Sequence, residues 1–471
     1  MRGTKKGKQF LIGFIIVGLF YFQAAIAQDG YHITFSVKHI PDSACFLVRY
    51  TGDKTYLVDT ARVMDHTFTF DGSTGLEKGM YMVAGQSKNK YIDFIVNDAS
   101  RFRIETDTTD WIGRIRIRGS KENQLFFDYI SYLQQKRKQV DSLNHLVSGD
   151  TSGSQPSIFI AEQIKSIDRE VTSHQKELAN LHRDTFFGVF LLASLEPDVW
   201  NKVKQEQDPS ERARLLREYK NLYWDHFDLT DERLLHTPLF HPRMEQYMDD
   251  LVHPSVDSIA REIDSLLSQV SASKPVYEYL VWYFTLKYER SKIMGYDAVF
   301  VHMANRYFKT GRADFINETV RQNVIKRSNI LEPLLIGKTA PLMILLDTSE
   351  MPVSLYQIEK AYTIIYFWDT DCSFCRKESP RLKQFYDASK DSLNLEVYAV
   401  CIDTSLTDWK KTINEHGFDW INVNGYLSLT PDFHDLYDVH SSPVMYLLDR
   451  RKTIIAKNIL TDQIIEILNQ K

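Results

Sequence analysis

Two cysteines three residues apart constrain this chain more than any other feature of its sequence. Cys372 and Cys375 follow Thr363–Trp368, a stretch typical of a buried strand, and precede a stretch typical of a helix. At such a junction the first thiol reaches the start of the helix, where unpaired N–H groups and the helix dipole stabilise an anion. The second thiol lies one helical turn further on, within disulfide reach. The pattern predicts that Cys372 attacks a disulfide and that Cys375 resolves the mixed disulfide.

Other uses of a Cys-x-x-Cys pair fit the sequence less well. A zinc site needs a second pair of ligands, and none has suitable spacing. A c-type haem site needs histidine directly after Cys375, where the chain has Arg376. The Thr-x-x-Cys spacing of peroxiredoxins is also lacking, and a structural disulfide without turnover stays an alternative. We therefore expect no metal and no cofactor, and we expect Cys45 and Cys401 to be unreactive core thiols.

The pattern after residue 335 predicts an α/β domain. A helix at 373–390 follows the first strand, and a second buried strand covers 395–402. The expected continuation is a helix at 406–416 stopped by Gly417, strands at 444–448 and 453–457, and a last helix capped by Thr461-Asp462. This β-α-β-α-β-β-α order is that of a thioredoxin core.

The same region, about residues 335–471, resembles the TlpA/ResA branch of the thioredoxin superfamily. The resemblance is carried by the motif Phe367-Trp368-x-x-x-Cys372-x-x-Cys375-x-x-Glu378-x-Pro380. It implies a glutamate, Glu378, beneath the cysteines as a proton-transfer group, and a proline, Pro380, that bends the active-site helix. Glu378 is also one turn beyond Cys375, so its carboxylate could take the proton that this thiol must lose. A solvent-facing helix glutamate is the alternative.

Ser442-Pro443 resembles the cis-proline loop of this branch, which faces the cysteines and contacts the substrate backbone. Trp368 belongs to the same substrate-facing set by resemblance, and an ordinary proline at the start of a strand is the alternative for Pro443. Two positions depart from the branch. Tyr366 stands where aspartate or asparagine is usual, and Asp371 stands where tryptophan often precedes the first cysteine.

Two further regions precede the thioredoxin-like domain, which we place at 333–471. Residues 28–119 contain short alternating segments separated by turn residues, which predicts a β-sandwich. Residues 120–332 carry apolar positions at helical spacing, interrupted by an expected loop at 148–157, and predict an all-α domain. An N-terminal β domain, a helical middle and a TlpA-like end resemble exported oxidoreductases of Bacteroidota, in which the two upstream regions have no known role.

Residues 1–27 have the features of a secretory signal peptide. A basic start is followed by an apolar run at 10–22 and by the small-x-small site Ala25-Ile26-Ala27. Cleavage there removes four positive charges and takes the formal net charge from −5 to −9. An acidic surface of this kind gives no electrostatic footprint for nucleic acid. We expect a periplasmic or cell-envelope protein, with an uncleaved inner-membrane anchor as the alternative.

These observations predict an exported thiol-disulfide oxidoreductase that reduces protein disulfides. Strong oxidants stabilise their thiolate heavily, whereas Ser373-Phe374 supplies no charge and Asp371 opposes an anion at Cys372. The resemblance implies a membrane thiol transporter as electron donor and a protein client such as an apocytochrome. The alternative is an envelope binding or scaffold protein whose thioredoxin-like domain only responds to redox state.

Overall fold

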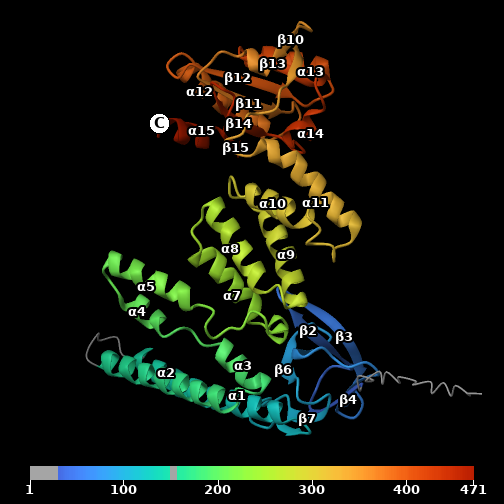
Figure 1. Cartoon of the computed structure of the whole chain (residues 1–471), viewed down its shortest axis with the longest axis vertical. Coiled ribbons are helices and arrows are strands. Elements are labelled where there is room, and N and C mark those ends of the chain that lie inside the picture. The colour runs from blue at the N-terminus through green and yellow to red at the C-terminus, as the bar shows by residue number, and fades with distance from the viewer. Residues whose placement is uncertain (1–29, 149–155, 471) are drawn as a thin grey trace, which may run out of the picture. The chain divides into compact units, whose positions relative to one another are not determined.

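The computed structural model describes residues 30–148 and 156–470 (Figure 1). The predicted signal peptide and most of the predicted 148–157 loop lie outside these residues. The chain divides into two compact units. The first holds most of the N-terminal strands and of the two long helices that follow them, and the second holds the later helices and the C-terminal sheet.

The N-terminal strands form the two facing sheets of the predicted β-sandwich. One sheet has the order β4-β1-β7-β8 and the other has the order β3-β2-β5-β6. Alternate residues of β1 are buried, and Phe35 on β1 meets Phe94 of the other sheet at a ring-centroid distance of 5.6 Å. The strands are β1 (Tyr31–Lys38), β2 (Ala44–Thr51), β3 (Lys54–Arg62), β4 (Thr67–Gly72), β5 (Gly79–Ala84), β6 (Lys90–Val96), β7 (Arg101–Asp107) and β8 (Arg116–Arg118).

The middle of the chain is helical, as its apolar spacing predicts. In one of its helices, α8, the buried side chains recur every three or four residues and form a single apolar stripe. The helices are α1 (Lys121–Ser148), α2 (Pro156–Leu181), α3 (Phe186–Ala193), α4 (Val199–Gln205), α5 (Pro209–Leu222), α6 (Glu232–Leu235), α7 (Phe240–Gln246), the π-helix η1 (Tyr247–Leu251), α8 (Val256–Gln269), α9 (Lys274–Glu289), α10 (Asp297–Met303), the π-helix η2 (Ala304–Phe308), α11 (Glu318–Leu331) and the 3₁₀ turn η3 (Glu332–Leu334).

The C-terminal part is a seven-stranded sheet with helices on both faces. Its order is β10-β9-β13-β12-β11-β14-β15, and the central strands β13, β12 and β11 are parallel. The elements are β9 (Ile344–Asp347), β10 (Pro352–Ser354), the 3₁₀ turn η4 (Leu355–Gln357), β11 (Tyr362–Trp368), α12 (Cys375–Ser389), β12 (Leu395–Cys401), α13 (Leu406–His416), β13 (Ile421–Ser428), α14 (Phe433–Tyr437), β14 (Val444–Asp449), β15 (Ile454–Ile459) and α15 (Thr461–Asn469).

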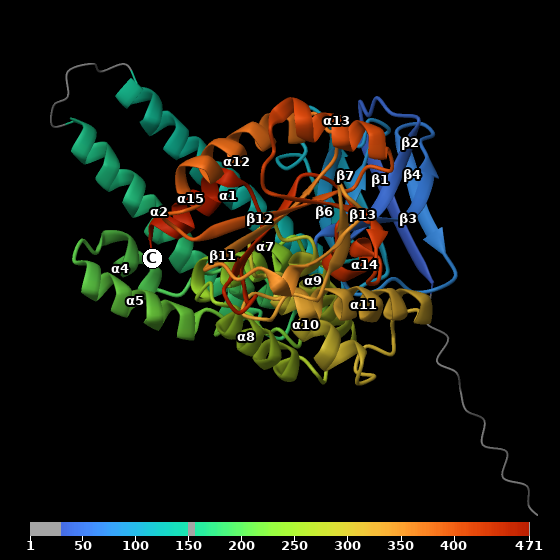
Figure 2. The ribbon, with the colours of Figure 1, turned by 90° about the horizontal axis from the view of Figure 1, so that it is seen from above.

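The two faces of this sheet are covered by different helices because strand residues alternate between faces. On β11, Tyr366 and Trp368 pack with α12, α13 and α15, whereas Ile365 and Phe367 pack with α14. Figure 2 shows α12 and α15 beside each other on one side of the sheet. Because α12 follows directly from the end of β11, its first turn lies at the edge where the parallel strands end.

Two local expectations differ from the structure, and strand β13 was not predicted. The helix after β11 begins at Cys375 rather than at 373. The last helix is capped by Leu460, whose N–H donates to the side chain of Gln463 at 3.0 Å, so Thr461 is its first residue and not its cap. Strand β13 was not expected, because Asn422 and Asn424 interrupt its apolar pattern.

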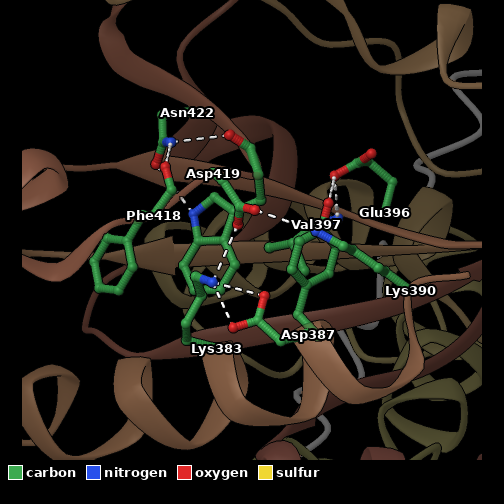
Figure 3. A network of polar contacts seen from close by, with 10 residues as sticks. Lys383, Asp387, Lys390, Glu396, Val397, Phe418, Asp419 and Asn422 are labelled. Carbon is green, nitrogen blue, oxygen red and sulfur yellow. Dashed lines mark hydrogen bonds and ion pairs between the residues drawn. The ribbon is translucent and has the colours of Figure 1, made fainter.

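Both asparagines of β13 are buried and hydrogen-bonded. The Asn422 amide donates to the carbonyls of Phe418 and Trp420 at 2.8 and 2.9 Å, and its oxygen accepts from the Trp420 indole at 3.0 Å. Figure 3 shows this group beside an ion-pair network in which Asp419 contacts Lys383 of α12 and Lys390, the residue directly after that helix. The segment that leads into β13 is therefore tied to the active-site helix.

Replacing Asn422 by leucine is expected to destabilise the C-terminal part by ~2–3 kcal/mol, because it leaves two buried carbonyls and an indole N–H unpaired. Calorimetry of the full chain measures this as a fall of about 5–10 °C in the C-terminal transition. The matched control is Asp419→Asn, which removes only exposed ion pairs worth ~0.2–1 kcal/mol. Equal losses in the two variants would contradict the role given to the Asn422 hydrogen bonds.

Candidate active site

Cys372 and Cys375 lie in the turn between β11 and α12. Cys375 is the first residue of the helix and is 1% exposed, whereas Cys372 is half-buried. The backbone N–H of Cys375 donates to the Cys372 sulfur at 3.1 Å. On its other side, the Cys372 thiol donates to the carbonyl of Ser442 at 3.4 Å. The sulfur of Cys372 therefore sits between the start of α12 and the loop that precedes β14.

The two thiols have opposite acidities. Partial burial alone would raise the pKa of Cys372, but hydrogen bonds from the Cys375 thiol and from N–H groups at the start of α12 lower it below its ordinary value. Burial, together with the hydrogen bond to Cys372, raises the pKa of Cys375 above its ordinary value. The accessible thiol is thus also the one that ionises first, which is what a nucleophile requires.

Alkylation of the reduced protein should therefore label Cys372 before Cys375. At pH 7 we expect a rate difference of at least ~10-fold, because only the thiolate reacts and Cys375 is both buried and protonated. The labelling rate of Cys372 should rise with pH and level off below the ordinary thiol pKa, and that of Cys375 should level off above it. Mass spectrometry of the labelled peptides measures both rates. In denaturant the difference should vanish, and reversed rates in the folded protein would mean that the nucleophile is misassigned.

Glu378 is a buried carboxylate one turn beyond Cys375. It is 5% exposed, and its Oε1 accepts a hydrogen bond from the N–H of Thr461 at 2.7 Å. That N–H belongs to the first residue of α15, so the carboxylate lies at the positive end of a second helix. The structure thus places Glu378 inside the domain and not on the solvent face of α12.

Tyr366 lies beneath the cysteines, at a position where the sequence departs from the branch it resembles. Its hydroxyl pairs with the Ser379 hydroxyl at 2.7 Å. Burial raises the pKa of Tyr366 well above its ordinary value, Ser379 opposes this, and negative charge on Cys375 or Glu378 raises it further. The phenol therefore stays protonated within the electrostatic reach of both groups. Sequence reasoning noted this tyrosine only as a departure.

The other residues expected at the site surround the cysteines. The Ser442–Pro443 peptide bond is cis, as the resemblance led us to expect, and both residues are partly exposed. Trp368 is 2% exposed, meets Phe418 edge to face at 5.8 Å and lines a small hollow beside Cys375. Its indole N–H has no hydrogen-bond partner among the residues that the structure describes. A contact between substrate and Trp368, Ser442 or Pro443 stays a prediction.

The remaining two cysteines are fully buried free thiols. Burial raises the pKa of Cys45 and of Cys401 to about 12. Over residues 30–148 and 156–470, no three His, Cys, Asp or Glu side chains are grouped so as to hold a metal ion. Within the same ranges, no helix has the length and apolar character needed to cross a membrane.

Comparison with protein families divides the chain into three matched regions. Residues 336–457 match the AhpC/TSA family. Residues 189–327 match a domain of unknown function, DUF5106, and residues 31–126 match another, DUF4369.

Curated relatives and solved structures are each similar to part of the chain. The thiol-disulfide oxidoreductase ResA of Bacillus thuringiensis (strain Al Hakam) is 24% identical over 124 residues, 26% of this chain and 69% of the relative. ResA of Bacillus subtilis (strain 168) is 26% identical over 119 residues, 25% of this chain and 64% of the relative. A crystallised domain of a possible thiol-disulfide isomerase from Cytophaga hutchinsonii is 36% identical, over 29% of this chain and 93% of that one, with a TM-score of 0.28. A thioredoxin-like protein from Bacteroides caccae is 21% identical, over 55% of this chain and 93% of that one, with a TM-score of 0.43.

Proposed function

Since the C-terminal domain is a thioredoxin-like domain of the thiol-disulfide oxidoreductases, we propose that this protein reduces protein disulfides through Cys372 and Cys375. The observation that carries the proposal is the asymmetry of the pair. The Cys372 sulfur is accessible, accepts an N–H from the start of α12 and has a lowered pKa, whereas Cys375 is buried with a raised pKa.

The exchange takes two displacements at sulfur. The Cys372 thiolate attacks one sulfur of the client disulfide, so a mixed disulfide forms and the other client sulfur leaves as a thiolate that takes up a proton. Cys375 then loses its proton and attacks the Cys372 sulfur, which releases the second client sulfur as a thiolate. The client gains two electrons, and this protein is left with a Cys372–Cys375 disulfide. A membrane thiol donor restores both thiols by the same exchange in reverse.

Glu378 is the proposed acceptor for the Cys375 proton. Cys375 cannot ionise unaided near neutral pH because burial raises its pKa. A carboxylate on the same helix, one turn away and itself buried, can accept the proton where bulk water has little access. The hydrogen bond from the Thr461 N–H to its Oε1 holds the carboxyl group in place at the start of α15.

The reducing direction and the location complete the proposal. Neither Ser373 nor Phe374 contributes charge between the cysteines, so the thiolate is not stabilised as strongly as in a potent oxidant. Residues 1–27 are proposed to direct export, after which the protein acts in the periplasm or cell envelope on clients such as apocytochromes. The three proposed regions of the mature chain are 28–119, 120–332 and 333–471.

Turnover of a protein disulfide tests the proposal. The full chain, regenerated by a thiol reductant, should accelerate reduction of insulin disulfides far above the rate of the reductant alone. Cys401→Ser is the matched control, since it removes a buried thiol outside the pair, and it should retain activity. An inactive wild-type chain that still binds envelope proteins would instead support the scaffold alternative.

A further inference from the structure

Two ion pairs connect the last helices of the helical region to the C-terminal part of the chain, all within the second compact unit. Arg327 on α11 pairs with Asp438, and Asp297 at the start of α10 pairs with Lys457 on β15. Helix α11 also packs against α14, which ends directly before Asp438 (Figure 1). Charged groups of the helical region therefore contact the residue that follows α14 and the edge strand β15.

The Arg327–Asp438 pair is partly withdrawn from water. The side chain of Asp438 is 13% exposed and that of Arg327 is 34% exposed. Asp438 ends α14 in the left-handed conformation, with φ of 55°, and its carboxylate also lies 3.3 Å from Nε2 of His440. A charge-assisted hydrogen bond to a partly desolvated carboxylate is stronger than an exposed ion pair. Arg327 thus holds the residue at which the chain leaves α14.

Asp438 begins the loop that reaches Cys372. The 438–443 loop runs from Asp438 to Pro443, and its second residue, Val439, is fully buried. Its base is held further by the Tyr446 hydroxyl, which donates to the carbonyl of Tyr437 at 2.7 Å. At its far end the Ser442 carbonyl lies 3.4 Å from the Cys372 sulfur. Only three residues separate the residue that Arg327 holds from the carbonyl that meets the nucleophile.

The second ion pair, between Asp297 and Lys457, joins the helical region to strand β15. Lys457 is 4% exposed, pairs with Asp297 and donates to the carbonyl of Leu334 at 2.7 Å. Burial lowers the pKa of Lys457, and Asp297 opposes this shift. A buried ammonium group needs such partners, and Asp297 of the helical region supplies the opposite charge.

We propose that Arg327 is a positioning residue for protein disulfide exchange. Through Asp438 it sets the 438–443 loop, and thus Ser442, at the distance from Cys372 that a client polypeptide needs when it docks beside the nucleophile. The inference rests on the proposed function and gives the end of the helical region a role in it. A small disulfide, which has no polypeptide backbone to place, does not depend on this loop.

Exchange rates with a large and a small disulfide test this directly in the full-length protein. Arg327→Ala should lower kcat/KM for insulin disulfides by at least ~5-fold, mainly through KM, since a ~1 Å misplacement of a binding group can reduce rate by as much as ~10²-fold. The rate with the small aromatic disulfide dithiobis(nitrobenzoate) should stay within about twofold of the wild-type rate. Arg327→Lys should recover part of the loss, because it keeps the charge but not the planar fork.

Matched variants separate positioning from folding. Arg321→Ala removes another arginine of α11, one that pairs with Glu318 and the carbonyl of Phe308, and should leave both rates unchanged. Asp438→Asn removes the negative charge, and asparagine tolerates the positive φ at this position. This variant should lose as much rate with insulin disulfides as Arg327→Ala, and the double variant should lose no more than either single variant. Three results with an active wild type would overturn this inference but not the proposed function. They are an equal loss of rate on both substrates in Arg327→Ala, no loss in that variant, and additive losses in the double variant. A wild type inactive on both substrates would overturn the proposed function, and the inference with it.

Discussion

Replacing Cys372 by serine is expected to abolish protein disulfide reduction, with a loss of ~10³-fold or more, because the attacking thiolate is removed. Serine nearly preserves the side-chain volume, so the fold should persist. The hydroxyl cannot ionise near neutral pH, and the N–H of Cys375, which meets the sulfur at 3.1 Å, cannot change that. Insulin reduction and full-chain calorimetry measure the two effects.

Cys375→Ser should fail differently, at the second step. The Cys372 thiolate remains, so a mixed disulfide with the client forms, but no resolving thiol is present to release it. Non-reducing electrophoresis and mass spectrometry should find Cys372 joined to client protein. In cells the same variant identifies the client. Trapping by Cys372→Ser together with no trapping by Cys375→Ser would reverse the roles assigned to the two cysteines.

Replacing Glu378 by glutamine is expected to slow resolution of the mixed disulfide by ~10²-fold, at the lower end of what a positioned general base contributes. Glutamine keeps the volume and an oxygen that can accept from the Thr461 N–H, a bond of 2.7 Å in the native protein. Only the proton acceptor is lost. Attack by Cys372 should be unaffected, so mixed disulfide should accumulate in single-turnover experiments.

The pH dependence identifies the cause of the slow step. In Glu378→Gln the resolution rate should recover as pH rises, because hydroxide then takes the proton from Cys375, whose pKa burial raises. Glu378→Ala is the contrasting variant. It leaves the Thr461 N–H unpaired and should also destabilise the domain by ~1–3 kcal/mol. A resolution rate equal to wild type between about pH 6 and 9 in Glu378→Gln would remove the carboxylate from the mechanism.

The sequence by itself determined the order and type of most elements near the site. Apolar runs such as Thr363–Trp368 and the Gly417 stop report local backbone preference and burial, and β11 and α13 follow them closely. Strand β13 was not predicted because Asn422 and Asn424 are polar. Their burial is explained by hydrogen bonds, from Asn422 to the carbonyls of Phe418 and Trp420 just before it and from Asn424 to the distant carbonyl of Asp403. Periodicity detects apolar burial and cannot detect polar groups whose partners lie elsewhere in the chain.

The active site, too, was determined partly by the sequence and partly by the tertiary structure. Spacing along the chain sets Cys372 before the helix and Cys375 on its first turn, so the thiol pair could be read from sequence. The sequence could not decide whether Glu378 faces solvent or the interior, because helical spacing is compatible with both. The packing of α15 against α12, which brings the Thr461 N–H to the carboxylate, decides it. The contact of Arg327 with Asp438 joins residues 111 positions apart. Pairings of that range depend on how whole elements pack, and the tertiary structure alone decided them.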